Sequence, residues 1–259
     1  MKINTNSNVY IITYSVVMVV IVAVLLTLAA VGLKPMQDEN ILNDNKKQIA
    51  KTLSKDPESV SFDDYNKLVE KAILIDTLGV EIKECKEEDV FNALKNVENP
   101  RKDGAAALSL FVAKDGRVVI PLRGKGLWDD IWGFVALDSD MNTIKGIVLD
   151  HKGETPGLGA EIATKDHQDK YVDKTIFKGN KLVGITLVKG GVKKESKNLA
   201  HEVDAITGGT KTSKGVENMI KDCLKWYQPY LTAAKAAVVA AQETTSECEC
   251  AEGKTNDLN

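Results

Sequence analysis

Two glycines followed by a run of hydroxyl side chains form the most suggestive segment of the chain, at residues 204–216. The residues concerned are Gly208, Gly209, Thr210, Lys211, Thr212 and Ser213. A short apolar stretch precedes them and a helical pattern follows, so they lie where a helix begins. The free N–H groups and partial positive charge of a helix N-terminus favour bound anions. The pattern therefore predicts a phosphate-handling helix start, with simple N-capping by Thr212 or Ser213 as the alternative.

A second glycine-rich segment follows a predicted strand that ends at Asp150. It contains Glu154, Thr155, Gly157, Leu158 and Gly159. The Pro-Gly pair at 156–157 is typical of a tight turn, and the later glycine allows another close approach of the backbone. This loop could cradle a planar or anionic ligand, or it could be an ordinary connection between elements. The residues alone leave both interpretations open.

Several other kinds of site are excluded by residue spacing. Gly124-Lys125-Gly126 lacks the hydroxyl residue that a P-loop needs after its lysine, and Ile162 stands where a dinucleotide fingerprint needs its third glycine. The three histidines and four cysteines show no metal-ligand spacing, so we expect no metal site. A net charge of −3, from 34 basic and 37 acidic residues, argues against a nucleic-acid partner.

Residues 9–33 form an unbroken run without a charged side chain. A bilayer core about 30 Å thick needs roughly 20 helical residues, so this run is long enough to span it. The alternative is a cleaved signal peptide, but the apolar core of such peptides is usually about 7–15 residues long. We therefore expect an uncleaved single-pass anchor. Lysines occur on both flanks, mixed with acidic residues after the run, and this leaves the orientation undecided.

The chain as a whole is expected to have four parts. They are an anchor at residues 1–36, a helical connecting region at 37–95, a compact domain at 96–230, and a last part at 231–259. This last part consists of an alanine-rich segment and, from residue 244, a tail that we expect to be disordered. The connecting region includes a predicted helix at 59–73.

Within the domain, short runs bounded by turn residues predict strands at 117–122, 133–137, 143–150 and 181–188. Residues 214–226 predict a helix that Pro229 ends. This mixture indicates an α+β fold, in which a single transmembrane helix precedes a domain of mixed sheet and helix.

Three segments together resemble a known family of flavin-binding subunits. Residues 154–159 read Glu-Thr-Pro-Gly-Leu-Gly, and residues 204–213 are similar to the flavin-attachment motif D-x-x-[ST]-G-[AG]-T-x-[ST]-[ST]. Residues 121–128, Pro-Leu-Arg-Gly-Lys-Gly-Leu-Trp, are similar to a segment typical of the C subunits of Na+-translocating NADH:quinone reductases. The family also includes the G subunits of Rnf complexes. One departure is Gly209, where alanine is more usual.

The resemblance implies a covalently bound flavin. In this family FMN is joined through its phosphate to a threonine hydroxyl, here that of Thr210, by a separate flavin transferase. The other residues assigned to cofactor binding are Gly208, Gly209, Lys211, Thr212, Ser213, Glu154, Thr155, Gly157, Leu158, Gly159, Leu127 and Trp128. Of these, residues 155 and 158 are expected near the isoalloxazine ring. Trp128 is either a ring contact or a core residue.

The function that the resemblance implies is electron relay within a sodium-pumping NADH:quinone oxidoreductase, whose activity no single subunit completes. The implied partners are the other subunits and the flavin transferase. The implied location is the bacterial inner membrane, with the flavin domain facing the periplasm. Two alternatives stay open: a G subunit of an Rnf-type ferredoxin:NAD oxidoreductase, and a membrane-tethered binding module without a cofactor.

Overall fold

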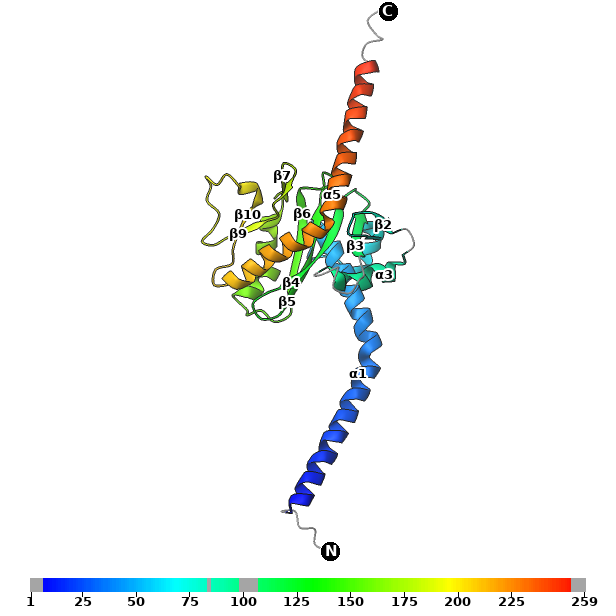
Figure 1. Cartoon of the computed structure of the whole chain (residues 1–259), viewed down its shortest axis with the longest axis vertical. Helices are drawn as coiled ribbons and strands as arrows, with labels where there is room; N and C mark the ends of the chain where they lie inside the picture. Colours follow the sequence, from blue (N-terminus) through cyan, green and yellow to red (C-terminus); the bar gives the residue numbers. More distant parts are fainter. Residues whose placement is uncertain (1–6, 83–84, 98–106, 253–259) are drawn as a thin grey trace, which may run out of the picture. The chain divides into compact units, whose positions relative to one another are not determined.

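The computed structural model describes residues 7–82, 85–97 and 107–252. The chain forms two compact units, Met1–Asn45 and Lys46–Asn259, and helix α1 (Asn8–Leu53) contributes residues to both. The first unit is drawn in blue in Figure 1. Each unit is described by itself.

Helix α1 contains the apolar run that the sequence singles out. Among the described residues it is the one helix long and apolar enough to cross a membrane, as the sequence predicts. Pro35 follows the apolar run but lies inside α1, which continues to Leu53. The residues beyond the run are therefore helical as far as Leu53, shortly before the Asp56-Pro57 pair.

The second unit is built on a six-stranded sheet in the order β2-β1-β3-β4-β5-β6, in which every neighbouring pair is antiparallel. The strands are β1 (Val69–Ile75), β2 (Glu81–Ile82), β3 (Leu108–Ala113), β4 (Val118–Lys125), β5 (Asp130–Leu137) and β6 (Ile144–His151). Successive side chains of a strand point to opposite faces. Both faces of the central strands are buried, which explains why β3 reads as an almost continuous apolar run.

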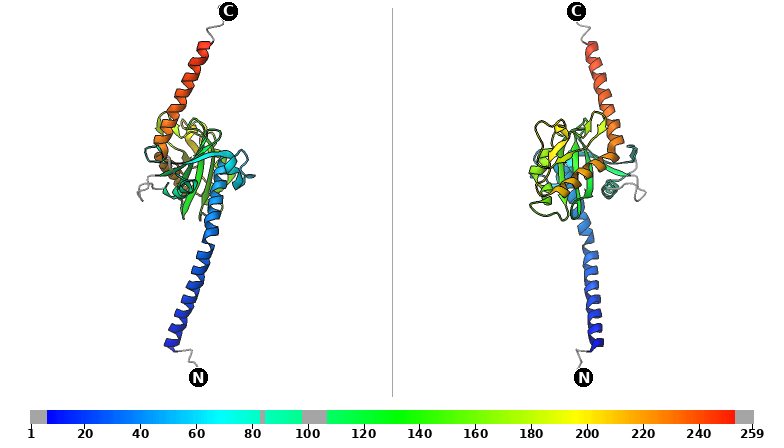
Figure 2. Two further views of the ribbon diagram at one scale, coloured as in Figure 1. Left: turned by 90° about the vertical axis from the view of Figure 1, so that its right-hand side faces the viewer. Right: turned by 60° about the vertical axis from the view of Figure 1, so that its left-hand side comes forward.

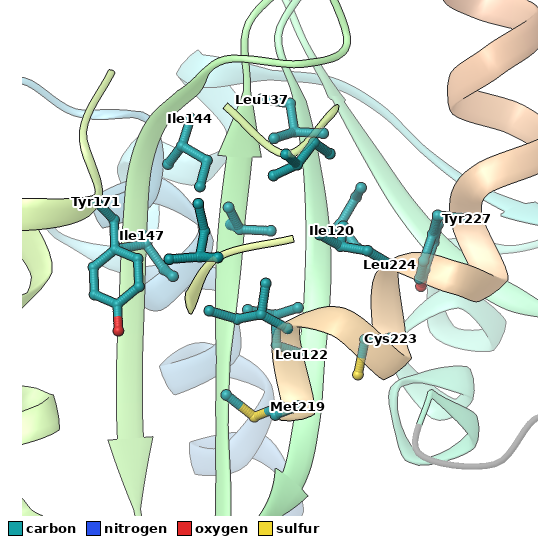
Figure 3. Packing of buried hydrophobic residues seen from close by; sticks show 14 of the residues in the cluster. Ile120, Leu122, Leu137, Ile144, Ile147, Tyr171, Met219, Cys223, Leu224 and Tyr227 are labelled. Carbon is teal, nitrogen blue, oxygen red and sulfur yellow. The ribbon is translucent and has the colours of Figure 1, made fainter. Parts of the chain in front are cut away.

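Helices cover the two faces of the sheet. One face packs against α5 (Thr210–Glu252); Figure 3 shows Met219 and Leu224 of this helix close to Ile120 and Leu122 of β4. The other face packs against the end of α1, α2 (Tyr65–Leu68) and α3 (Glu87–Asn92), where the ring of Phe111 contacts those of Tyr65 and Phe134. Figure 2 shows α5 and the end of α1 on opposite sides of the sheet.

Short elements complete the second unit. They are η1 (Phe62–Asp64), η2 (Ala93–Asn96), η3 (Gly159–Ala163), α4 (Lys165–Gln168), η4 (Asp169–Tyr171), β7 (Phe177–Lys178), β8 (Lys181–Leu182), β9 (Thr186–Val188), η5 (Leu199–His201) and β10 (Glu202–Asp204). The pair β7–β8 is antiparallel, and β9 pairs with β10 in parallel. The chain passes from β10 directly into the turn that begins α5.

The α+β fold is confirmed, and the strands predicted at 117–122, 133–137 and 143–150 correspond to β4, β5 and β6. The single strand expected at 181–188 is instead two short strands, β8 and β9. Gly184 lies between them with φ +67°, a left-handed conformation that interrupts an extended strand.

The helix expected at 59–73 is wrong at both ends: helical turns span only 62–68, as η1 and α2, and the chain beyond residue 68 forms strand β1. This strand lies between β2 and β3, and its residues Ile73 and Ile75 are buried in the core. Pairing with β3 explains the strand conformation, since it satisfies the backbone hydrogen-bonding groups of a buried segment. The compact unit of the structure that contains this strand spans Lys46–Asn259, and the domain expected at 96–230 lies within it.

Pro229 does not end the last helix, contrary to expectation, because α5 continues to Glu252. Leu231 is fully buried in the core, and Lys235 Nζ donates to Gly179 O at 3.4 Å, so tertiary packing supports the helix beyond the proline. A proline inside a helix removes one hydrogen bond and bends the axis. Figure 1 shows that α5 changes direction along its length. The tail expected to be disordered from residue 244 is helical as far as 252, and 253–259 lie outside the described residues.

Candidate functional site

The glycine pair makes a tight turn between β10 and α5. Gly208 has φ +78°, and a Cβ there would lie 2.5 Å from Leu158 Cδ2. The N–H of Gly209 donates to Ile206 O at 3.0 Å, and Gly209 O accepts the N–H of Ser213 at 2.8 Å. Gly209 therefore stands at the N-cap, and Thr210 is the first residue of the helix. Neither Thr212 nor Ser213 occupies the N-cap position that the alternative interpretation of the sequence requires.

Three hydroxyl groups in the first turn of α5 have different surroundings. Thr212 and Ser213 are buried, whereas Thr210 is exposed. Ser213 Oγ accepts the N–H of Ile206 at 3.0 Å, and Thr212 Oγ1 donates to Glu154 Oε2 at 2.6 Å. Of the three, the Thr210 hydroxyl is thus the one presented at the surface.

The carboxylate of Glu154 joins this turn to the other two segments that carry the family resemblance. Its Oε1 accepts the N–H of Leu127 at 2.7 Å and that of Trp128 at 3.0 Å. Burial alone would raise the pKa of Glu154, but the hydrogen bonds from Thr212 and from these two N–H groups outweigh it and hold the pKa below its usual value. Glu154 is expected from the sequence to bind the cofactor, yet its carboxylate is occupied by the protein itself.

Apolar side chains are exposed around this carboxylate. Leu127 is 52% exposed and Trp128 is 70% exposed at the tip of the β4–β5 hairpin, and Leu158 is 42% exposed beside Gly208. Trp128 Nε1 donates to Thr155 Oγ1 at 3.2 Å. The exposed indole excludes the core alternative for Trp128. The structure thus brings Leu127, Trp128 and Thr155 together, with Leu158 next to the turn at Gly208-Gly209 (the expected attachment turn).

Ion pairs between charged residues that the sequence analysis did not select connect the two strands directly beside the hairpin tip. Asp130 pairs with Arg123 at 2.8 Å and also with Lys125, and Asp129 pairs with Lys152 at 3.0 Å. The hydrogen bond from Lys125 is the main cause that lowers the pKa of Asp130. Basic residues at 123, 125 and 152 and acidic residues at 129 and 130 were the available signal, but their pairing depends on the register of the sheet.

Two further residues of the attachment motif have structural partners. Asp204 Oδ1 accepts the N–H of Val192 at 2.7 Å and so holds the glycine turn at 190–191 beside the motif. Lys214, in the first turns of α5, forms an ion pair with Glu217. Lys211 is exposed next to Thr210.

The comparisons with known proteins agree with this geometry. Residues 126–225 match the family described as FMN-binding domain, a range that includes the hairpin tip, the loop at 154–159 and the attachment turn. The C subunit of the Na+-translocating NADH-quinone reductase of Haemophilus ducreyi is 32% identical over 258 residues, covering 92% of this chain and 99% of the relative. The chain belongs to the family of these C subunits. The corresponding protein of Pseudomonas aeruginosa is also 32% identical, over 74% of this chain and 82% of its own length.

Solved structures of C subunits show the same fold. The protein from Parabacteroides distasonis is 34% identical with a TM-score of 0.65, covering 77% of this chain and 97% of that one. The protein from Shewanella oneidensis is 30% identical with a TM-score of 0.61, covering 78% of this chain and 99% of that one. The relatives are named as subunits of a larger oxidoreductase. Because this chain belongs to their family, it is one component of such an enzyme.

Proposed function

We propose that this chain is the electron-relay subunit of a Na+-translocating NADH:quinone reductase and carries FMN joined through a phosphoester to Thr210. The observation that carries the proposal is the exposed hydroxyl of Thr210 at the first residue of α5, in a turn that lies beside Leu158. Glu154 links the same turn to the exposed apolar side chains of Leu127 and Trp128. The match of residues 126–225 to the FMN-binding domain family supports the choice of cofactor.

The residues around Thr210 fit the phosphate of FMN. The first N–H groups of an α-helix have no partner within the helix, and they carry partial positive charge that favours an anion. Gly208 and Gly209 have no side chain that would crowd the approach to the hydroxyl, and Lys211 adds a positive charge at the surface. Together these features stabilise a phosphodiester that retains one negative charge.

The apolar residues fit the isoalloxazine ring. Leu127 and Leu158 offer aliphatic surface, and the hydrogen bond to Thr155 fixes the direction of the Trp128 indole. Bound FMN supplies reversible one- and two-electron transfer, and the protein contributes binding, orientation and electrostatics. In this proposal Leu127, Trp128 and Leu158 orient the ring and keep water from part of it.

The proposed partners follow from the same role. A relay needs an electron donor and an electron acceptor, and we assign these to other subunits of the membrane complex. We also assign attachment of the flavin to a separate flavin transferase. We further propose that α1 spans the membrane once and that the domain lies on the periplasmic side.

The covalent bond is tested by removing the acceptor hydroxyl. The full chain is produced together with a flavin transferase, and flavin fluorescence is measured in a denaturing gel. We expect Thr210→Ala to lose the fluorescent band and Thr210→Ser to keep it, because only serine retains a hydroxyl. The mass of the peptide that contains residue 210 locates the modification.

Thr186→Ala is the matched control, since it removes an exposed hydroxyl outside the attachment motif, on strand β9 beside β10, and should keep the flavin. A fluorescent band in Thr210→Ala, or a wild-type chain without flavin when the transferase is present, would contradict the proposal.

A further inference from the structure

One buried carboxylate links the three segments of the flavin site. Glu154 is 4% exposed, and it accepts hydrogen bonds from the hairpin tip and from the first turn of α5. It belongs itself to the third segment, the loop at 154–159. These three segments are far apart in the sequence, and Glu154 bonds directly to both of the others.

Glycines enclose the carboxylate closely on two sides. A Cβ at Gly126 would lie closer than 3.0 Å to Oε1, and a Cβ at Gly159 would lie closer than 3.0 Å to Oε2 and to Thr212 Oγ1. Real Cβ atoms essentially never approach other atoms so closely. The carboxylate therefore fills the space between hairpin, loop and helix, and both of its oxygens are engaged by the protein.

We infer that Glu154 is a positioning residue: its carboxylate fixes the hairpin tip with Leu127 and Trp128 relative to the helix turn that bears Thr210. The inference rests on the proposed function, because it assigns Glu154 no contact with the flavin and an effect on the flavin only through these neighbours. It replaces the direct cofactor contact that the sequence suggests for this residue.

The local physics favours a strong link. The exposed side chains of the hairpin tip have little packing of their own, so the two N–H bonds to Glu154 are important for its position. Hydrogen bonds to an ionised carboxylate are stronger than neutral ones. Without the carboxylate, two N–H groups and the buried Thr212 hydroxyl would lose their acceptor, which is unfavourable for buried groups.

Amide hydrogen exchange tests the link without any flavin. The full chain is made without the flavin transferase, and exchange is followed by mass spectrometry in peptides that cover residues 124–131. In Glu154→Ala we expect the amides of Leu127 and Trp128 to exchange about ten-fold faster or more, because their acceptor is lost. Glu154→Gln keeps an acceptor oxygen of similar reach and should retain most of the protection.

Glu161→Ala is the matched control in the same loop. Its Oε1 accepts the N–H of Gly157 at 3.1 Å, so exchange should change near residue 157 and stay unchanged at 124–131. Unchanged exchange at 124–131 in Glu154→Ala would overturn the inference.

A second pair of variants leaves the charge in place. Gly159→Ala puts a methyl group against the carboxylate and should raise exchange at the hairpin tip in the same way. Gly153→Ala, in the same loop, has no atom within 4 Å of its new Cβ and should have no effect. Equal exchange in these two variants would count against the inference even if Glu154→Ala failed to fold.

The effect on the flavin is measured on chains made with the transferase. Visible circular dichroism reports the asymmetry of the ring's surroundings. We expect Glu154→Ala and Thr212→Val to change this signal, while Thr212→Ser, which keeps the hydroxyl, and Gly153→Ala should leave it close to wild type. If Glu154→Ala raises amide exchange at 124–131 but leaves the visible circular dichroism of the flavin unchanged, the link between Glu154 and the flavin is overturned. A wild-type chain without flavin would instead refute the proposed function, and the exchange experiment would still decide the role of Glu154 in the hairpin.

Discussion

Thr210, Thr212 and Ser213 carry the same functional group within four residues, but burial gives them different roles. Ser213 accepts a backbone N–H and Thr212 donates to Glu154, so both hydroxyls stabilise the turn. Thr210 is left at the surface. The first turn of α5 thus has one exposed hydroxyl and two buried ones with protein partners, which is why the alanine and serine variants of residue 210 test the proposed attachment.

Another buried group should make the stability of the domain depend on pH. His167 is 4% exposed, and its Nε2 lies 3.1 Å from the hydroxyl oxygen of Tyr171. Burial, with a contribution from Lys170, lowers the pKa of His167 from 6.5 to about 4. The unfolded chain therefore takes up a proton as pH falls below 6.5, while the native chain resists protonation until about pH 4. The contribution of His167 to the free energy of unfolding is therefore fully present above pH 6.5. As the pH falls this contribution decreases, and at pH 4 the domain has lost about 3 kcal/mol of stability.

The measurement is the free energy of unfolding in urea at pH 7 and at pH 4.5. Carboxylates also titrate in this range, so the comparison is made with His167→Gln, which cannot take up this proton. We expect the wild-type chain to lose about 2–3 kcal/mol more than the variant between the two pH values. An identical loss in both chains would show that His167 is not the group responsible.

Among the secondary-structure elements, helix α5 is the one that connects the site at Thr210 to the hydrophobic core. Its first turn presents Thr210, and its next turns bury Val216, Met219 and Ile220 against the sheet. The position of the attachment turn is therefore set by the packing of the helix that follows it. The same helix remains part of the core beyond Pro229, where Leu231 is fully buried.

Leu231→Ala should destabilise the domain by about 2–5 kcal/mol, because it removes a buried side chain and leaves a cavity. The midpoint of thermal unfolding, followed by circular dichroism, reports the change. Leu78→Ala is the matched control: Leu78 is 76% exposed, and its truncation should cost about 0.5 kcal/mol or less. Equal midpoints for the two variants would mean that the helix beyond Pro229 does not support the core.

The whole molecule consists of an apolar helical unit and a domain that starts earlier in the sequence than the motifs suggest. The domain includes the end of α1 and strand β1, both of which contribute to its core. Because β1 lies between β2 and β3, the sheet is incomplete without it. The segment from residue 46 is thus part of the structure that holds the flavin site.

Truncation tests this boundary. A chain of residues 46–259 should be soluble and should unfold cooperatively, because it contains the whole compact unit. A chain of residues 96–259 should aggregate or fail to fold, because it exposes the edge of β3 and the apolar residues that β1 and α1 cover. Gel filtration and thermal unfolding distinguish these results. Cooperative unfolding of the shorter chain would contradict the boundary.

The strands that sequence reasoning recovers are β4, β5 and β6, whose apolar runs are bounded by glycine, aspartate and asparagine. Strands β1 and β3 were not predicted. Strand β3 is buried almost throughout, so it lacks the alternation of polar and apolar residues that marks a strand with one exposed face. Pro229 led to a further error, since the packing of Leu231 outweighs the tendency of proline to end a helix.

By itself the sequence determined the run that is long and apolar enough to span a membrane, the α+β class and the family, and it predicted Thr210 as the attachment residue. These follow from local composition and from motifs that are continuous in the chain. The tertiary structure decided which hydroxyl is exposed, where the domain begins, and that the Glu154 carboxylate bonds to the hairpin tip and to Thr212. Those features depend on burial and on contacts between segments distant in sequence, which arise only when the sheet brings β4, β6 and α5 together.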